Sequence, residues 1–171
     1  MLEFANWLAS TSLSATVVNN LWMIPAIQSV HIIAIGLLVG ALLMLDMRVL
    51  GVLSKDQTIA QVNNRYAPWI WGAILVLAIS GCLLIVGEPK RELLSFSFWA
   101  KMTLLVIGIA IVLAFQSSLK ANTAMWKDTG EPTPRTKFYA ILSICIWVAI
   151  IFLGRFIAWD AQIWGSLSPQ A

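Results

Sequence analysis

His31 is the only histidine in the sequence of 171 residues, and it lies in a long stretch that carries no charge. Between Trp22 and Leu45 there is no Asp, Glu, Lys or Arg, so His31 is the one titratable side chain of that stretch. A neutral imidazole is a good ligand for iron and copper, and it also forms hydrogen bonds between helices. An ionisable group at membrane depth is a candidate functional residue, so His31 is the first candidate of this chain.

Several polar residues are expected at the depth of His31 if the apolar stretches cross a membrane. Gln28 precedes His31 by about one helical turn. The remaining candidates follow or begin other apolar stretches: Glu88, Lys90, Arg91, Lys101, Met102 and Arg155. An imidazole with cationic side chains above it is the arrangement that binds haem b, because the imidazole ligates the iron and Lys or Arg pairs with the propionates.

The sequence therefore predicts a haem b site with His31 as the metal ligand. Lys101 and Arg155 are the expected propionate partners, since both lie at the ends of apolar stretches. Met102, or His31 of a second chain across a symmetric interface, is the candidate for a sixth ligand. A haem site within one chain is favoured over a site shared between two chains, because the cationic residues are expected to face the interior of their own bundle.

Plainer interpretations of the same residues stay open. His31 can be a hydrogen-bonding residue between helices, and terminal Lys and Arg side chains can be headgroup anchors. Glu88 can be an ion-pair partner of Lys101 or Arg155.

Other cofactor and catalytic chemistries have less support in the sequence. A copper site from His31, Met102 and Cys82 has suitable ligand types but no supporting spacing. One histidine and two separated cysteines, Cys82 and Cys145, are too few for structural zinc, and the cysteines are expected at different depths. The motifs of serine hydrolases, P-loop and dinucleotide-binding proteins and zinc proteases are absent.

The elements that would position these residues follow from composition. Hydrophobic residues make up 60% of the chain and charged residues 11%, against about 25% charged in soluble domains. Four apolar segments, at 22–45, 68–86, 98–115 and 138–156, are long enough to cross a hydrocarbon layer of about 30 Å. Short connections force neighbours to run antiparallel. We expect an all-α membrane protein, an up-down four-helix bundle with residues 1–171 as a single domain.

Residues 1–20 are expected to form an interfacial segment rather than a signal peptide. Glu3 stands where a positive charge would be required, and Phe4, Trp7 and Leu8 form one apolar helical face. This pattern predicts a helix in the membrane interface, with Ser12 or Ser14 capping a second short turn.

Two further patterns concern the first apolar segment. Gly36 and Gly40 form a GxxxG motif about 140–180° around the helix from His31, so one face is suited to close packing while the other presents the imidazole. Asp46 and Arg48 are interpreted as a structural pair that ends the helix and opens a polar connector reaching Arg65.

The distribution of basic residues predicts orientation. Seven of the eleven Lys and Arg residues fall on the side of the 46–65 and 120–137 connectors. The positive-inside rule then places both termini outside, in the periplasm of a bacterial inner membrane. No basic run is dense enough to indicate nucleic acid.

Three stretches carry a resemblance to a family. They are SVHIIAIGLLVGALLMLDMRVLG, SGCLLIVGEPKRELLSFSFWAKMTLL and GRFIAW. Across residues 21–160 the chain resembles a set of small uncharacterised bacterial inner-membrane proteins, to which no activity is attached. The residues that the resemblance singles out are His31, Asp46, Arg48, Glu88, Pro89, Lys101 and Arg155.

The topology is more distantly similar to CopD-type copper-resistance proteins and to bis-histidine b-type cytochromes. One histidine in place of four excludes a two-haem wire within one chain.

Two functions from different classes fit these observations. The first is a haem-b-binding inner-membrane protein in one-electron transfer, with a periplasmic redox partner. The alternative is a non-catalytic accessory or assembly subunit of a larger membrane complex, which the nine tryptophans and the GxxxG face suit equally well. A copper-related membrane protein and a homo-oligomer are further expectations.

Overall fold

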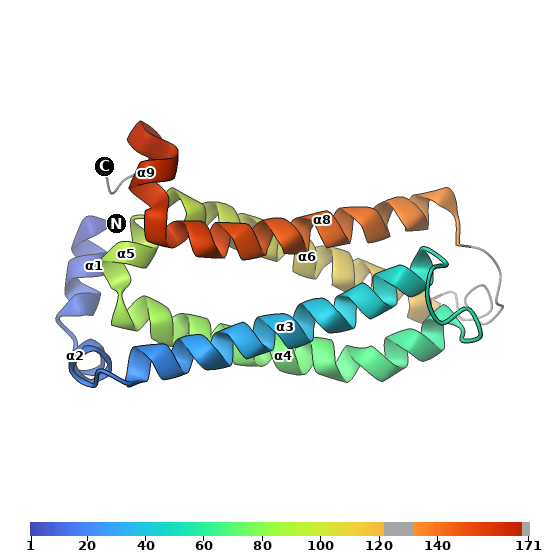
Figure 1. Ribbon diagram of the computed structural model, residues 1–171, viewed down its shortest axis with the longest axis horizontal. Helices are drawn as coiled ribbons and strands as arrows, with labels where there is room; N and C mark the ends of the chain where they lie inside the picture. The colour runs from blue at the N-terminus through green and yellow to red at the C-terminus, as the bar shows by residue number, and fades with distance from the viewer. Residues whose placement is uncertain (122–131, 169–171) are drawn as a thin grey trace.

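Four long antiparallel helices build the protein in an up-down order (Figure 1). The computed structural model describes residues 1–121 and 132–168. The long helices are α3 (Met23–Val49), α4 (Ile59–Gly87), α6 (Phe96–Ala121) and α8 (Pro134–Phe156). Each is long and apolar enough to cross a membrane, and no strand occurs within the described ranges. The prediction of an all-α four-helix membrane bundle is confirmed.

Large apolar side chains cover the outside of the bundle. Ile32 of α3, Leu75 of α4 and Val106 of α6 are exposed by 66%, 61% and 68%. A protein surrounded by water would bury such side chains, because each costs free energy on exposure. These outward faces are therefore suited to lipid contact.

The first two long helices extend beyond the predicted spans. Thr58 and Gln61 form a capping box, in which the Gln61 N–H donates to Thr58 Oγ1 at 3.2 Å and the Thr58 N–H donates to Gln61 Oε1 at 2.8 Å. This cap starts α4 well before Pro68, which lies inside the helix. The predicted polar connector from Asp46 to Arg65 is therefore wrong over most of its length, because both of its ends are helical.

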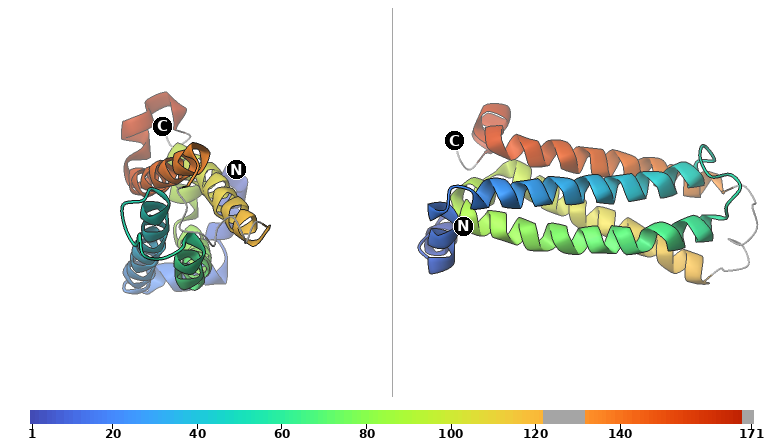
Figure 2. Two further views of the ribbon diagram at one scale, coloured as in Figure 1. Left: turned by 90° about the vertical axis from the view of Figure 1, so that its right-hand side faces the viewer. Right: turned by 60° about the horizontal axis from the view of Figure 1, so that its bottom comes forward.

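The long helices pack as two pairs. α3 packs most extensively on α4, and α6 packs on α8, while α3 and α8 join the two pairs. Helices α4 and α6 have few backbone contacts, although the Trp71 indole of α4 donates to Gln116 Oε1 of α6 at 3.1 Å; Figure 2 shows the four helices end-on. Leu38, Ile70, Val112 and Trp147 form the core where the pairs meet.

Short helices gather at one end of the bundle, here called the terminus end. They are α1 (Leu2–Ala9), α2 (Ser12–Asn19), α5 (Pro89–Leu93), η1 (Ile157–Trp159), α9 (Asp160–Trp164) and η2 (Gly165–Leu167). Both ends of the chain lie there (Figure 1). The opposite end, where α3 and α6 end and α4 and α8 begin, is called the loop end.

The N-terminal segment is packed onto this end of the bundle. Ala5 of α1 is fully buried beside Leu93 of α5, Phe98 of α6 and Ile157. The prediction of a cap at Ser12 or Ser14 is wrong, because Thr11 caps α2 and accepts a hydrogen bond from the Ser14 N–H at 3.3 Å. A threonine hydroxyl satisfies the free donors of a first turn as well as a serine does.

Candidate functional site

His31 points from α3 into the bundle, onto α4. Its Nδ1 lies 2.7 Å from the hydroxyl oxygen of Ser80, and that hydroxyl lies 2.7 Å from the carbonyl oxygen of Val76. A serine hydroxyl has one proton, and we assign it to the Val76 carbonyl; Ser80 then accepts from Nδ1–H. In this tautomer Nε2 keeps its lone pair, which is the form of imidazole that ligates a metal.

A glycine makes room for the imidazole. A Cβ atom at Gly81 would lie 3.6 Å from Cε1 of His31, so the ring rests on the bare backbone of α4. Ser80 is 4% exposed and His31 is half-buried. Helix α4 therefore sets both the position and the tautomer of the histidine, and neither Ser80 nor Gly81 is among the candidates from sequence.

Lys101 is the charged residue that the structure places near His31. Its ammonium lies 5.4 Å from the centroid of the Phe98 ring and interacts electrostatically with the imidazole. Its methylene chain passes Gly154 of α8, where a Cβ atom would lie 3.7 Å from Lys101 Cδ. The side chain is thus partly inside the bundle, and the site has His31 on one helix pair and Lys101 on the other.

Glu92 of α5 is the carboxylate that faces Lys101. Burial raises the pKa of Glu92 above its usual value, and the charges of Lys101 and Arg91 partly oppose this. An ion pair of Glu88 with Lys101 or Arg155 is one of the interpretations left open by the sequence. The structure instead pairs Glu88 with Arg91, whose Nη1 donates to Glu88 Oε2 at 2.6 Å. A signal for Glu92 was available in its spacing, one helical turn after Glu88.

The remaining predicted residues lie around this centre. Gln28 is half-buried one turn from His31, and Arg155 is exposed near the end of α8. Met102 packs against the cluster of Ala5, Leu93, Phe98 and Ile157. Within the described residues, no hydrogen bond or ion pair joins Gln28, Met102 or Arg155 to His31.

Both cysteines are free thiols on the exposed surface. Cys82, the third residue of the copper hypothesis, faces outward from α4, next to Gly81. In the described parts of the chain, no three residues among His, Cys, Asp and Glu lie together as a metal-binding group.

The loop end contains a buried carboxylate that the sequence reasoning placed at a helix terminus. Asp46 is 8% exposed and lies beside Ser143 of α8. Its Oδ2 has no hydrogen-bond partner. Arg48 instead donates from Nε to the Gln57 carbonyl at 2.6 Å. The interpretation of Asp46 and Arg48 as a pair is wrong, because residues two apart on a helix point in different directions.

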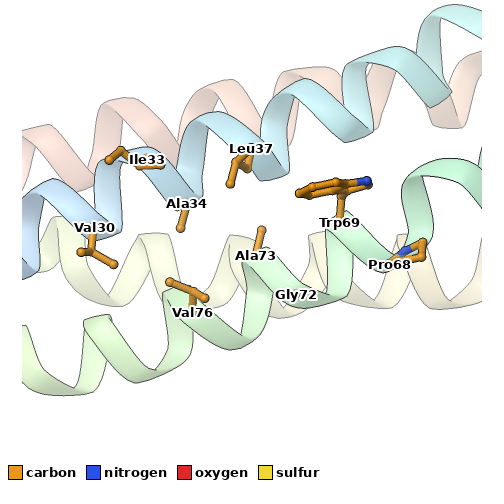
Figure 3. Close-up of a pocket in the computed structure, with 9 residues that line it drawn as sticks. All are labelled: Val30, Ile33, Ala34, Leu37, Pro68, Trp69, Gly72, Ala73 and Val76. Carbon is orange, nitrogen blue, oxygen red and sulfur yellow. The ribbon is translucent and has the colours of Figure 1, made fainter.

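An apolar groove runs along the outer side of α3 and α4. Figure 3 shows Val30, Ala34 and Leu37 of α3 opposite Trp69 and Val76 of α4, around a volume of about 550 Å³. Beyond it, a Cβ atom added at Gly36 or at Gly40 would have no other atom within 4 Å. The GxxxG face is thus open on the surface, so among the described residues it does not make the close helix packing for which it is suited. His31 lies on the opposite side of α3, facing α4.

Comparison with known proteins assigns the chain to a family. Residues 4–160 match the model of a family of unknown function, DUF6644, and the chain belongs to this family. No curated protein and no solved structure matches it. The expected likeness to CopD-type proteins and to b-type cytochromes therefore gains no support from these comparisons.

Proposed function

We propose that this DUF6644 protein binds haem b within the membrane and serves one-electron transfer. The observation that carries the proposal is the hydrogen bond from His31 Nδ1 to Ser80, which leaves Nε2 with its lone pair. A histidine ligand of haem iron is typically held in this way, with its second nitrogen bonded to a neighbouring acceptor.

The packing of the bundle supports a group bound between its two helix pairs. His31 belongs to the α3–α4 pair, and Lys101 belongs to the α6–α8 pair. At this depth each of them contacts a glycine, Gly81 and Gly154 respectively. Helices α4 and α6 have few backbone contacts with each other, so the two pairs are joined mainly through α3 and α8.

The charged residues suit the propionates of such a ligand. The Lys101 ammonium and the exposed Arg155 guanidinium are placed toward the terminus end, and each can form a charge-assisted hydrogen bond to a carboxylate. Haem would supply a reversible one-electron couple when bound, and the chain would supply the imidazole nitrogen of His31 and the counter-charges of Lys101 and Arg155. We further propose a bacterial inner membrane as the location, with the terminus end in the periplasm.

The absorption spectrum of the purified protein tests the proposal. The protein is produced in cells supplied with a haem precursor, and a Soret band at stoichiometric intensity is expected. His31→Ala should abolish the band while the protein stays folded, and Ser29→Ala, on the same helix but exposed, should keep it.

The outcomes separate the two functions. A band that persists in His31→Ala would show that the ligand is another residue. A folded protein without a band under ample haem supply would reject haem binding and leave the accessory-subunit alternative. Tags at the termini that are protected from protease in spheroplasts would overturn the proposed orientation.

A further inference from the structure

The second cavity of the bundle lies at the loop end, far along α3 from His31. Its volume is about 350 Å³, within the range of small-molecule sites, and helices α3, α6 and α8 enclose it. The walls are mostly aliphatic, with Phe115 of α6 and Tyr139 of α8 as the aromatic contributors. It shares no residue with the site around His31.

A buried, incompletely bonded carboxylate lines this cavity. Asp46 is more than nine-tenths buried, and its Oδ2 has no hydrogen-bond partner. A buried acceptor without a partner destabilises the folded state, and a charged one does so more strongly. Buried polar groups of this kind are commonly satisfied by a water, an ion or a ligand.

The surroundings of Asp46 indicate what kind of cation would bind. Calcium and magnesium are held by sets of hard oxygen ligands together with retained waters, whereas this cavity is mostly aliphatic and Asp46 is the only carboxylate among its lining residues. Apolar walls, aromatic rings and one carboxylate are instead the features that recognise an organic ammonium group, by ion pairing and cation–π contact.

The position of the cavity indicates an amphipathic ligand. Asp46 lies near the end of α3, and Arg135 and Thr136 lie in the first turn of α8, so the cavity is at the depth where the apolar helices reach the membrane surface. Arg135 is exposed, so its charge is screened by solvent more than the charge of Asp46.

We propose that this cavity binds an ammonium group carried on an apolar body, with Asp46 as its counter-ion and Phe115 and Tyr139 beside it. The ammonium donates to the free Oδ2 of Asp46, and the apolar part extends along the aliphatic wall. The same chemistry is offered by a free amphipathic amine and by the headgroup of an aminophospholipid. The site is independent of haem binding.

Calorimetric titration of the protein in a nonionic detergent tests this site, with octylammonium as the probe and octanol as its uncharged analogue. Saturable binding of octylammonium is expected, with octanol binding at least about tenfold more weakly. Asp46→Asn should weaken octylammonium binding by about tenfold to a hundredfold, the usual effect of losing a buried charge-assisted bond. Asp56→Asn, which changes an exposed carboxylate of the connector, should bind as the unmodified protein does.

A second pair of variants keeps the test decisive if Asp46→Asn does not fold. Ser118→Leu fills the cavity from α6 and leaves the carboxylate intact, so it should also abolish binding. Its neighbour Ser117 is exposed and outside the cavity, so Ser117→Leu is the matched control.

The two sources of the ammonium are separated by competition. Phosphatidylethanolamine added to the micelles should displace octylammonium if the site takes a lipid headgroup, whereas phosphatidylglycerol should not. If neither lipid competes, the site takes a free amine. Equal binding of octanol and octylammonium, or binding unchanged in both Asp46→Asn and Ser118→Leu, would overturn the proposal.

Discussion

Asp160 caps helix α6 from a position 63 residues further along the chain, by accepting the backbone N–H of Ser97 at 2.8 Å. The same carboxylate accepts from the Phe96 N–H at 2.9 Å and from the hydroxyls of Ser95 at 2.8 Å and Ser168 at 2.6 Å. Asp160 is 1% exposed. A negative charge at this point also stabilises the N-terminus of α6 through the helix dipole.

The first prediction concerns this cap. Asp160→Asn should lower the free energy of unfolding by about 1.5–3 kcal/mol, because the charge-assisted hydrogen bonds of the carboxylate are lost. The new side-chain NH₂ group would also face the N–H and O–H donors that now bind the carboxylate. Thermal unfolding in detergent measures the loss, and hydrogen exchange should localise it to the first turn of α6. Asp56→Asn, an exposed substitution, serves as the control. Equal stability of the two variants would contradict the capping role.

The prediction from sequence succeeded where apolar length alone decides the structure. Four long apolar runs are sufficient to identify four membrane helices, and the helical angle correctly placed His31 on the face opposite Gly36 and Gly40. Helix ends were less predictable, since the sequence reasoning equated the end of an apolar run with the end of a helix. The Thr58–Gln61 capping box was a readable signal that this rule ignored.

Contacts between helices could not be predicted from one sequence. The His31–Ser80 bond depends on the register between α3 and α4, and the Asp160–Ser97 bond depends on the path of the chain after α8. Asp46 was missed for a related reason. The end of the apolar run predicts a connector that starts at Asp46, whereas α3 continues through Val49 and carries the carboxylate into the bundle.

The second prediction concerns Ser80 as a positioning residue. Ser80→Ala removes the acceptor of His31 Nδ1–H and so frees both the tautomer and the rotation of the ring. Haem affinity should fall by about 10–100-fold, the usual effect of removing a bond to a metal ligand, and the Soret band should shift rather than vanish. Ser80→Thr keeps the hydroxyl and should restore the spectrum. An unchanged titration of haem into Ser80→Ala would show that the bond does not position the ligand.

The third prediction concerns the pH dependence that Glu92 introduces. Burial raises the pKa of Glu92 above its usual value of 4.5, although Lys101 and Arg91 oppose the shift. The folded state therefore binds this proton more tightly than the unfolded chain does. Its contribution to stability is complete below the usual value and is lost as the pH rises through the folded pKa.

Comparing the unfolding of Glu92→Gln with that of the unmodified protein between about pH 4 and about pH 7 isolates this contribution. The stability of the unmodified protein should fall relative to that of Glu92→Gln as the pH rises. Glu3→Gln removes an exposed carboxylate and controls for the change in net charge. Parallel curves for Glu92→Gln and the unmodified protein would mean that Glu92 is not desolvated.

The last prediction concerns the close approach of α6 and α8 at Gly108. A Cβ atom there would lie 3.2 Å from Cζ2 of Trp147 and 3.4 Å from Cγ2 of Ile146, closer than the buried indole can easily accept. Overpacking of this kind costs about 1–3 kcal/mol.

Gly40→Ala is the matched control, because Gly40 lies on the same kind of helix with no atom within 4 Å of the added methyl group. Both variants gain the same helix propensity, about 0.5–1 kcal/mol, so the difference between their free energies of unfolding reports the clash alone. Gly108→Ala should be the less stable of the two by about 1–3 kcal/mol in detergent, with a quenched or shifted tryptophan emission. If the two alanine variants unfold at the same temperature, α6 and α8 have room to separate, and the close packing at Trp147 does not hold the two helices together.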